Sequence, residues 1–187
     1  MTNPKRIARW VVATSTAVAA AASLAAPVAH AEPSPPDVPD RIAVEAGNQL
    51  FLVGHAVGVQ IYTCNATTAG INWSPAVPRA NLYGDNGKLI ATHFGGPTWQ
   101  ARDGSAVVAQ RVDGVTVDAT TIPWLLLSAV RSTSGDGDRL TKTTFIQRTA
   151  TTGGLAPAAA ECNDATVGTK VEVPYTADYH FWKATGG

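Results

Sequence analysis

The chain has 187 residues, with 14 Lys and Arg against 14 Asp and Glu; charged residues make up 15% of it and hydrophobic residues 45%. This composition excludes a disordered chain, which combines low hydrophobicity with high net charge. It also lacks the basic surplus of a nucleic-acid-binding protein. One domain is expected at this length.

The first 31 residues have the three parts of a secretory signal peptide. Lys5, Arg6 and Arg9 precede an apolar run over Trp10–Ala26, and an Ala-x-Ala motif ends at Ala31. The run is too short and too rich in Ala for a membrane anchor. We therefore expect cleavage after Ala31 and a secreted, extracellular protein with no stable membrane insertion. The 156 residues that remain carry a net charge of −3.

A proline-rich extension at residues 32–40 follows, and the folded domain is expected at residues 41–187. Within that domain, short runs of β-branched and aromatic residues alternate with Gly, Pro, Asn and Asp, which is the pattern of strands and turns. These runs predict strands at Gln49–Val53, Val57–Cys64, Lys88–Thr92, Ala106–Arg111, Trp124–Val130, Thr141–Arg148, Thr169–Pro174 and Tyr179–Lys183.

Alternation and turn chemistry support an all-β fold. In the second run Val57, Val59 and Ile61 point to one face and Gln60 to the other, whereas residues 124–127 are apolar on both faces, as in a strand buried twice. Hairpin turns are expected at Asn86-Gly87 and Asp103-Gly104, because these residues tolerate positive φ. The fold class is thus a single-domain antiparallel β-sandwich or a closed β-barrel, and both remain open.

Two cysteines are present, Cys64 and Cys162. An even number of cysteines in an exported chain predicts a disulfide, and no C-x-x-C motif indicates redox thiols. The bridge would close a loop of roughly 100 residues, for which loop-closure entropy sets an upper guide of about 4.7 kcal/mol.

His93 is the main catalytic candidate. It follows a predicted strand and precedes Gly95-Gly96-Pro97, and an imidazole with a pKa near 6.5 can exchange protons around neutrality. Asp103 or Asp178 would orient it, forming an acid–base pair. The alternative is a structural histidine that holds the turn, because no nucleophile motif accompanies it.

Trp99 is the main candidate for a ligand contact, since it lies close to the same glycines and an aromatic ring can stack on a sugar or grip an apolar ligand. Polar residues on the predicted strands would orient such a ligand; they are Tyr62, Gln60, Gln147 and Arg148. The alternative role of the aromatic residues is core packing, which is expected above all for Trp124.

No metal and no cofactor are expected. His55, His93 and His180 show no spacing typical of zinc ligands. Gly47 and the glycines that follow it do not form the G-x-G-x-x-G turn that a nicotinamide site needs, and no helix follows them.

Five stretches in order resemble the secreted bacterial and fungal proteins grouped as domain of unknown function 3455. The stretches are Gly58–Cys64, His93–Trp99 with Asp103–Ser105, Ile122–Leu127, Ile146–Arg148 with Thr152–Gly154 and Cys162, and Val173–Phe181. The resemblance covers nearly the whole chain after the signal peptide. It implies an exported β domain, and it brings no established activity and no catalytic residues.

Two functions remain in view. The first is a secreted β domain that binds a small apolar or sugar-like ligand, or an envelope component. The second is a cofactor-independent extracellular enzyme that uses His93 with Asp103 or Asp178. The sequence predicts a small-molecule or glycan ligand and no nucleic-acid partner, and it leaves the oligomeric state open.

Overall fold

The structure is a computed structural model that describes residues 1–2 and 33–186. The chain divides into two units, residues 1–31 and 32–187, and the fold below is that of the second. The predicted signal peptide lies outside the described residues, apart from its first two. Residues 33–39 of the proline-rich extension form neither helix nor strand.

The described residues form nine strands and two short 3₁₀ turns, and they include no α-helix. All strand pairs are antiparallel. In chain order the elements are η1 (Asp40–Ile42), β1 (Asn48–Thr67), β2 (Gly70–Trp73), β3 (Val77–Tyr83), β4 (Leu89–Phe94), β5 (Thr98–Ala101), β6 (Ala106–Val115), β7 (Trp124–Thr133), β8 (Thr143–Gly153), η2 (Ala159–Glu161) and β9 (Lys170–Ala184).

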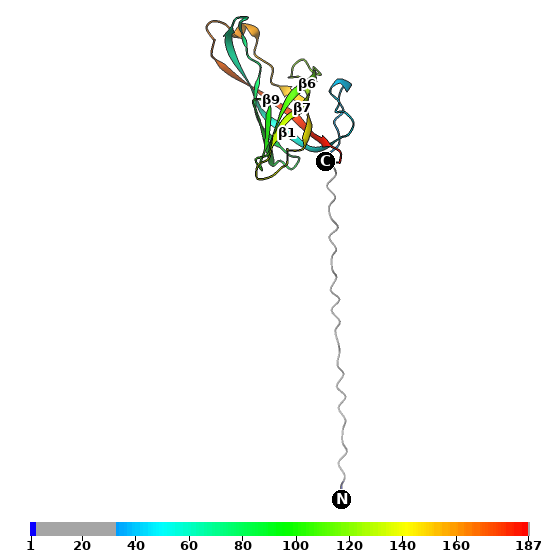
Figure 1. The fold of residues 1–187 in the computed structure, drawn as a ribbon. Coiled ribbons are helices and arrows are strands. Elements are labelled where there is room, and N and C mark those ends of the chain that lie inside the picture. Colours follow the sequence, from blue (N-terminus) through cyan, green and yellow to red (C-terminus); the bar gives the residue numbers. More distant parts are fainter. Residues whose placement is uncertain (3–32, 187) are drawn as a thin grey trace. The chain divides into compact units, whose positions relative to one another are not determined.

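The sheet closes on itself, so the closed barrel is the correct one of the two predicted architectures. Strands β3 to β9 pair in sequence order, and β1 pairs with both β3 and β9. Eight strands therefore form a ring, which Figure 1 shows as a curled sheet with β1 and β9 side by side. The ninth strand, β2, pairs only with the end of β1, beyond the ring.

The barrel interior is filled by large side chains over part of its length. Leu82, Val107, Leu140, Ile146 and Phe181 are fully buried there. An eight-stranded barrel is just wide enough for side chains to fill it or for one small ligand to occupy it. Where the large side chains stop, space remains inside the ring.

The N-terminal segment covers the outer surface over β6, β7 and part of β8. η1 packs against β6 and β7, and its Ile42 is fully buried. Gln147 donates from Nε2 to the Ile42 carbonyl at 2.7 Å and accepts from the Trp182 indole at 2.9 Å. This cover explains why Leu126 is buried although it points out of the barrel, so the strand is buried on both faces at Leu126 and Leu127, as predicted. Trp124, which was expected in the core, is only partly buried and is not part of the core cluster.

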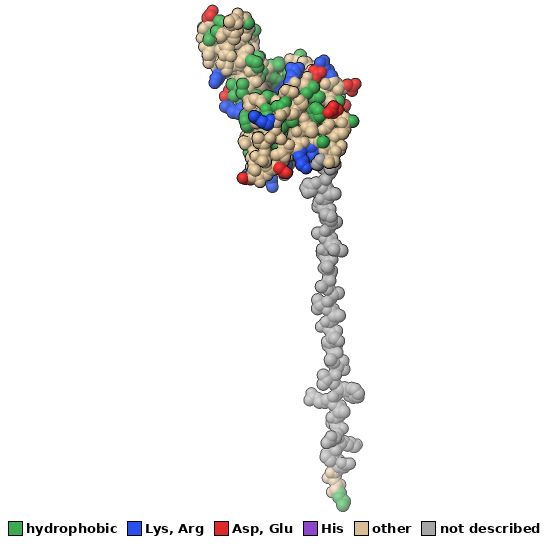
Figure 2. All heavy atoms as spheres, in the orientation of Figure 1, with side chains coloured by type: hydrophobic (Ala, Val, Ile, Leu, Met, Phe, Trp, Pro, Cys, Tyr) green, Lys and Arg blue, Asp and Glu red, His purple; other side chains and the backbone are tan. Residues whose placement is uncertain are grey.

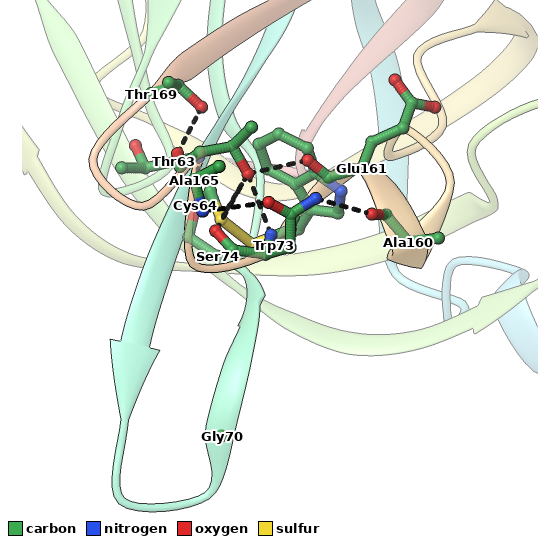
Figure 3. Close-up of a disulfide and its surroundings, with 12 residues drawn as sticks. Thr63, Cys64, Gly70, Trp73, Ser74, Ala160, Glu161, Ala165 and Thr169 are labelled. Atoms are coloured by element: carbon green, nitrogen blue, oxygen red, sulfur yellow. Dashed lines mark hydrogen bonds between the residues drawn. A yellow bond between two sulfur atoms is a disulfide. The ribbon is translucent and has the colours of Figure 1, made fainter.

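The disulfide joins Cys64 to Cys162 as predicted. It lies just beyond the point where β1 and β9 stop pairing, at Thr63 and Lys170. Figure 3 shows it beside the indole of Trp73, which donates to the Ala158 carbonyl at 3.2 Å, with the β1–β2 hairpin leading away. Charged side chains are sparse at this end in Figure 2, and the chain has none at residues 63–78.

The predicted strands are found, but three were missed and some boundaries were wrong. The first two predicted strands are one continuous strand, β1, and the last two are joined in β9. The missed strands are β2, β3 and β5. Both predicted hairpin turns are correct: Asn86-Gly87 connects β3 to β4, and Asp103-Gly104 connects β5 to β6.

None of the helices among the described residues is long and apolar enough to span a membrane.

Candidate ligand-binding cavity

A cavity of about 450 Å³ opens at one end of the barrel. Every strand of the ring contributes to its wall, which identifies it as the unfilled part of the barrel interior. Small residues around the opening leave the space free: Ala76, Gly95, Gly96 and Ala109. Its volume lies within the range of roughly 300–1,000 Å³ that small-molecule sites occupy.

His93 lies on the inner wall of this cavity and is 3% exposed. Its ring stacks on the Trp99 indole with centroids 4.1 Å apart and planes within 7°. The ring of Tyr179 meets both at an angle, with centroids 5.1 and 5.4 Å away. The three aromatic side chains come from β4, β5 and β9 and form one cluster at the cavity wall.

The environment of His93 keeps the imidazole neutral. Burial lowers its pKa to about 3, the hydrogen bond to the Thr98 carbonyl opposes that shift, and the charge of Arg148 adds to it. Because a carbonyl only accepts, Nδ1 must carry the proton that it donates to Thr98 at 2.9 Å. The other ring nitrogen, Nε2, is then an acceptor. A histidine in this state is a poor general base at neutral pH.

Arg148 brings a positive charge into the cavity. Its Nε and Nη2 donate to the Pro123 carbonyl at 3.1 and 2.8 Å, which fixes the guanidinium plane. No carboxylate of the described residues lies within ion-pair distance of it. Burial raises the pKa values of the phenols of Tyr62, Tyr175 and Tyr179, and the charge of Arg148 opposes that rise at each.

Two buried donors on the cavity wall have no hydrogen-bond partner among the described residues. They are Nε2 of Gln60 and Nε1 of Trp99, on side chains that are 2% and 1% exposed. A buried polar group without a partner costs about 1–3 kcal/mol, so native structures rarely leave one unused. Both atoms are closed to solvent, so an acceptor on a ligand would reach them only after a shift of the side chains.

The structure brings four of the predicted site residues together at this cavity: His93, Trp99, Gln60 and Arg148. Tyr62 lies behind them, where its hydroxyl donates to the Gly154 carbonyl at 2.6 Å. Gln147 lies on the outer face of β8 under η1, because neighbouring residues of a strand point to opposite faces.

Neither predicted carboxylate is brought to His93. Asp103 is in the β5–β6 turn, where it accepts hydrogen bonds from the Ser105 hydroxyl at 2.6 Å and from the backbone N–H of Arg139. Asp178 lies outside the barrel, with its Oδ1 2.7 Å from Nδ1 of His55. The other ring nitrogen of His55 is 2.9 Å from Asp85, and these two carboxylates raise the pKa of His55.

Sequence reasoning missed several cavity residues. Tyr179 was placed at the start of a predicted strand and was not among the candidate site residues, although it completes the cluster with His93 and Trp99. Ala109, Leu127 and Arg111 were not singled out. The only signal in the sequence is their place on the same alternate face of predicted strands, and that pattern does not tell which face is inside.

The residues that the structure describes hold no group of three or more His, Cys, Asp or Glu side chains able to bind a metal ion. His55, His93 and His180 in particular do not converge: they lie on the outer face of β1, inside the cavity and on the outer face of β9.

Comparison with known proteins gives one match. The family model described as a protein of unknown function, DUF3455, matches residues 45–183, which is most of the chain. The chain belongs to this family. The match includes all nine strands except the last residue of β9, and with them the whole cavity wall. No curated protein and no solved structure matches the chain.

Proposed function

We propose that this DUF3455 protein is an exported binding protein that holds a small, largely apolar ligand inside its barrel. The observation that carries this proposal is the cavity of about 450 Å³ at the open end of an otherwise filled interior. Its wall combines aliphatic and aromatic side chains with a few polar groups, the usual composition of a small-molecule site.

Export is part of the proposal. It is supported by the signal-peptide pattern that ends at Ala31, and the Cys64–Cys162 disulfide is compatible with an oxidising compartment. A stable barrel with a preformed cavity suits a protein that takes up a ligand outside the cell, because little ordering is required on binding.

Binding of a neutral fluorescent probe tests the proposal. N-Phenyl-1-naphthylamine is uncharged, and it fluoresces strongly only in apolar surroundings. We expect saturable binding of one probe per chain. Ala109→Phe should weaken that binding by about tenfold or more, because overfilling a packed site costs roughly 1–3 kcal/mol and 1.4 kcal/mol is a factor of ten.

Val112→Phe is the matched control, since it adds the same side chain at an exposed position of the same strand. A second variant, Val77→Trp, narrows the opening from a position that is 47% exposed and therefore tolerant of substitution. It should slow probe association if the barrel mouth is the entrance. Absence of probe binding would refute the proposal, and so would equal binding by wild type and both cavity variants.

A further inference from the structure

The cavity wall carries positive charge that nothing in the wall balances. Two of its 16 residues are arginines, the partly buried Arg148 and the exposed Arg111, and none is an Asp or Glu. Fully exposed arginines are commonly balanced by water and salt, whereas Arg148 is only partly exposed and faces a wall without a carboxylate. The missing negative charge is a property of the site that the binding of an apolar ligand does not explain.

The hydrogen bonds of Arg148 leave part of its guanidinium available. Nε and one proton of Nη2 are directed to the Pro123 carbonyl, and the side chain also hydrogen-bonds to Tyr179. A guanidinium has five N–H donors in a rigid plane, so donors remain beyond these two partners. Such donors suit the oxygens of a carboxylate, with which they form charge-assisted hydrogen bonds.

The unused neutral donors point to the same chemistry. Nε2 of Gln60 and Nε1 of Trp99 both need an acceptor, and both residues share the cavity wall with Arg148. The two unpartnered buried atoms of the wall are thus both donors, and a group rich in acceptors complements them best. A carboxylate is such a group, because it has two oxygens and donates nothing.

The remaining side chains of the cavity wall are mostly apolar. Leu125, Leu127, Ala109 and Pro97 also line the cavity, and they offer only apolar contacts from their side chains. A ligand with a charged head on Arg148 would place its hydrocarbon portion here.

We propose that the cavity selects an amphipathic carboxylate, an aliphatic or aromatic acid whose carboxylate docks on Arg148 while its apolar part packs against the apolar residues of the wall. This inference rests on the proposed function and names the ligand class for the same cavity. Because Arg148 is held by the Pro123 carbonyl, it acts as a preformed anchor, and little ordering is required when a carboxylate binds.

Competition between a matched acid and alcohol tests the inference. Decanoate and 1-decanol have the same carbon chain, and each is used at pH 7.5 to displace N-phenyl-1-naphthylamine from the wild-type protein. We expect decanoate to bind at least tenfold more tightly than 1-decanol. In Arg148→Met, which keeps an apolar side chain of similar length, the two affinities should become equal within about threefold.

Arg131→Met is the control, because it removes one positive charge from an exposed position of β7 that does not line the cavity. It should retain the preference for decanoate. If Arg148→Met does not fold, the affinity ratio in the wild-type protein decides alone.

The possible failures are distinguishable. Binding of the neutral probe with equal affinities for acid and alcohol would overturn the carboxylate inference and leave the proposed function intact. An equal loss of preference in both arginine variants would also overturn it, since the effect would then come from overall charge. No binding of probe, acid or alcohol would refute the proposed function itself.

Discussion

The state of a single imidazole follows from where the fold puts it. His93 and His55 have the same intrinsic chemistry, but burial beside Trp99 and Arg148 lowers the pKa of His93 to about 3, while Asp85 and Asp178 raise that of His55. The sequence reasoning chose His93 for acid–base work because of the glycines that follow it. In the structure, the carboxylates of Asp85 and Asp178 contact His55 and not His93.

The lowered pKa makes a prediction for stability. An unfolded histidine binds a proton below about pH 6.5, whereas folded His93 does so only near pH 3. Between these values the unfolded state binds more protons, so this group's contribution is complete above pH 6.5 and falls as the pH is lowered, by up to about 1.4 kcal/mol per pH unit.

Urea unfolding of wild type and His93→Gln between pH 7.5 and 4.5 checks this effect. The stability advantage of wild type over the variant should shrink steadily as the pH falls below 6.5. His55→Gln is the control with the opposite sign, because a raised pKa contributes stability at low pH that is lost as the pH rises through the folded value. Parallel curves for wild type and His93→Gln would contradict the assigned burial of this imidazole.

At the level of the strands, one glycine decides how closely β1 and β3 approach. Gly58 pairs with Ala80, and a Cβ atom at Gly58 would overlap the Arg79 carbonyl oxygen and lie 2.5 Å from the Ala80 Cα. Both atoms belong to the backbone, so no rotation of a side chain relieves the contact. A glycine inside a strand often marks such a close approach.

Gly58→Ala should therefore separate β1 from β3 and lower the free energy of unfolding by about 2–3 kcal/mol. Gly84→Ala is the matched control: its φ is not in the left-handed region, and an added Cβ would be 3.4 Å from Ile90, an ordinary contact. The control should change stability by no more than about 0.5 kcal/mol. Chemical denaturation measures both, and equal stabilities for the two variants would contradict the close approach.

The strands that the sequence reasoning missed share a physical cause. β2 and β5 have four residues each, too short for alternation to be recognised. β3 includes Pro78, Arg79 and Asn81, which are unusual in isolated strands. Each of these segments is held by its neighbours in the ring, so its conformation depends on tertiary pairing that a local pattern does not contain.

For the molecule as a whole, closure of the sheet into a barrel buries the opposite face of β1 from the one that alternation alone predicts. The aliphatic face of β1 points outward, with Val57 57% exposed, and the barrel interior receives Gly58, Gln60 and Tyr62. In an open amphipathic strand the aliphatic face would be the buried one. The inner face of β1 is made of small and polar residues because it borders a cavity and a close strand neighbour.

The same closure explains which site residues could be predicted. His93, Trp99, Gln60 and Arg148 were chosen as chemically capable residues next to turns or on strands, and the ring gathers them because all four point inward. Pairing a histidine with a carboxylate requires the strand order and the face of each residue. The spacing of residues along the chain gives neither the strand order nor the face of each residue. The carboxylates proposed as partners of His93, Asp103 and Asp178, therefore do not lie beside it.

The disulfide stabilises the barrel as a whole, because it links β1 to the segment that precedes β9. β1 and β9 form the seam that closes the barrel, and Cys64 and Cys162 are joined just beyond its end across 98 residues of chain. In the unfolded state this bridge holds about two thirds of the folded domain in a loop. We expect reduction to lower the free energy of unfolding by about 2–4 kcal/mol, since removal of a bridge of this span restores loop entropy to the unfolded chain. Urea titrations with and without dithiothreitol measure the change, and thiol counting verifies that reduction is complete.

A Cys64→Ala, Cys162→Ala double variant should resemble the reduced protein and show no response to the reductant. An unchanged midpoint in fully reduced wild type would mean that hydrogen bonding along β1 and β9 alone is enough to keep the barrel closed.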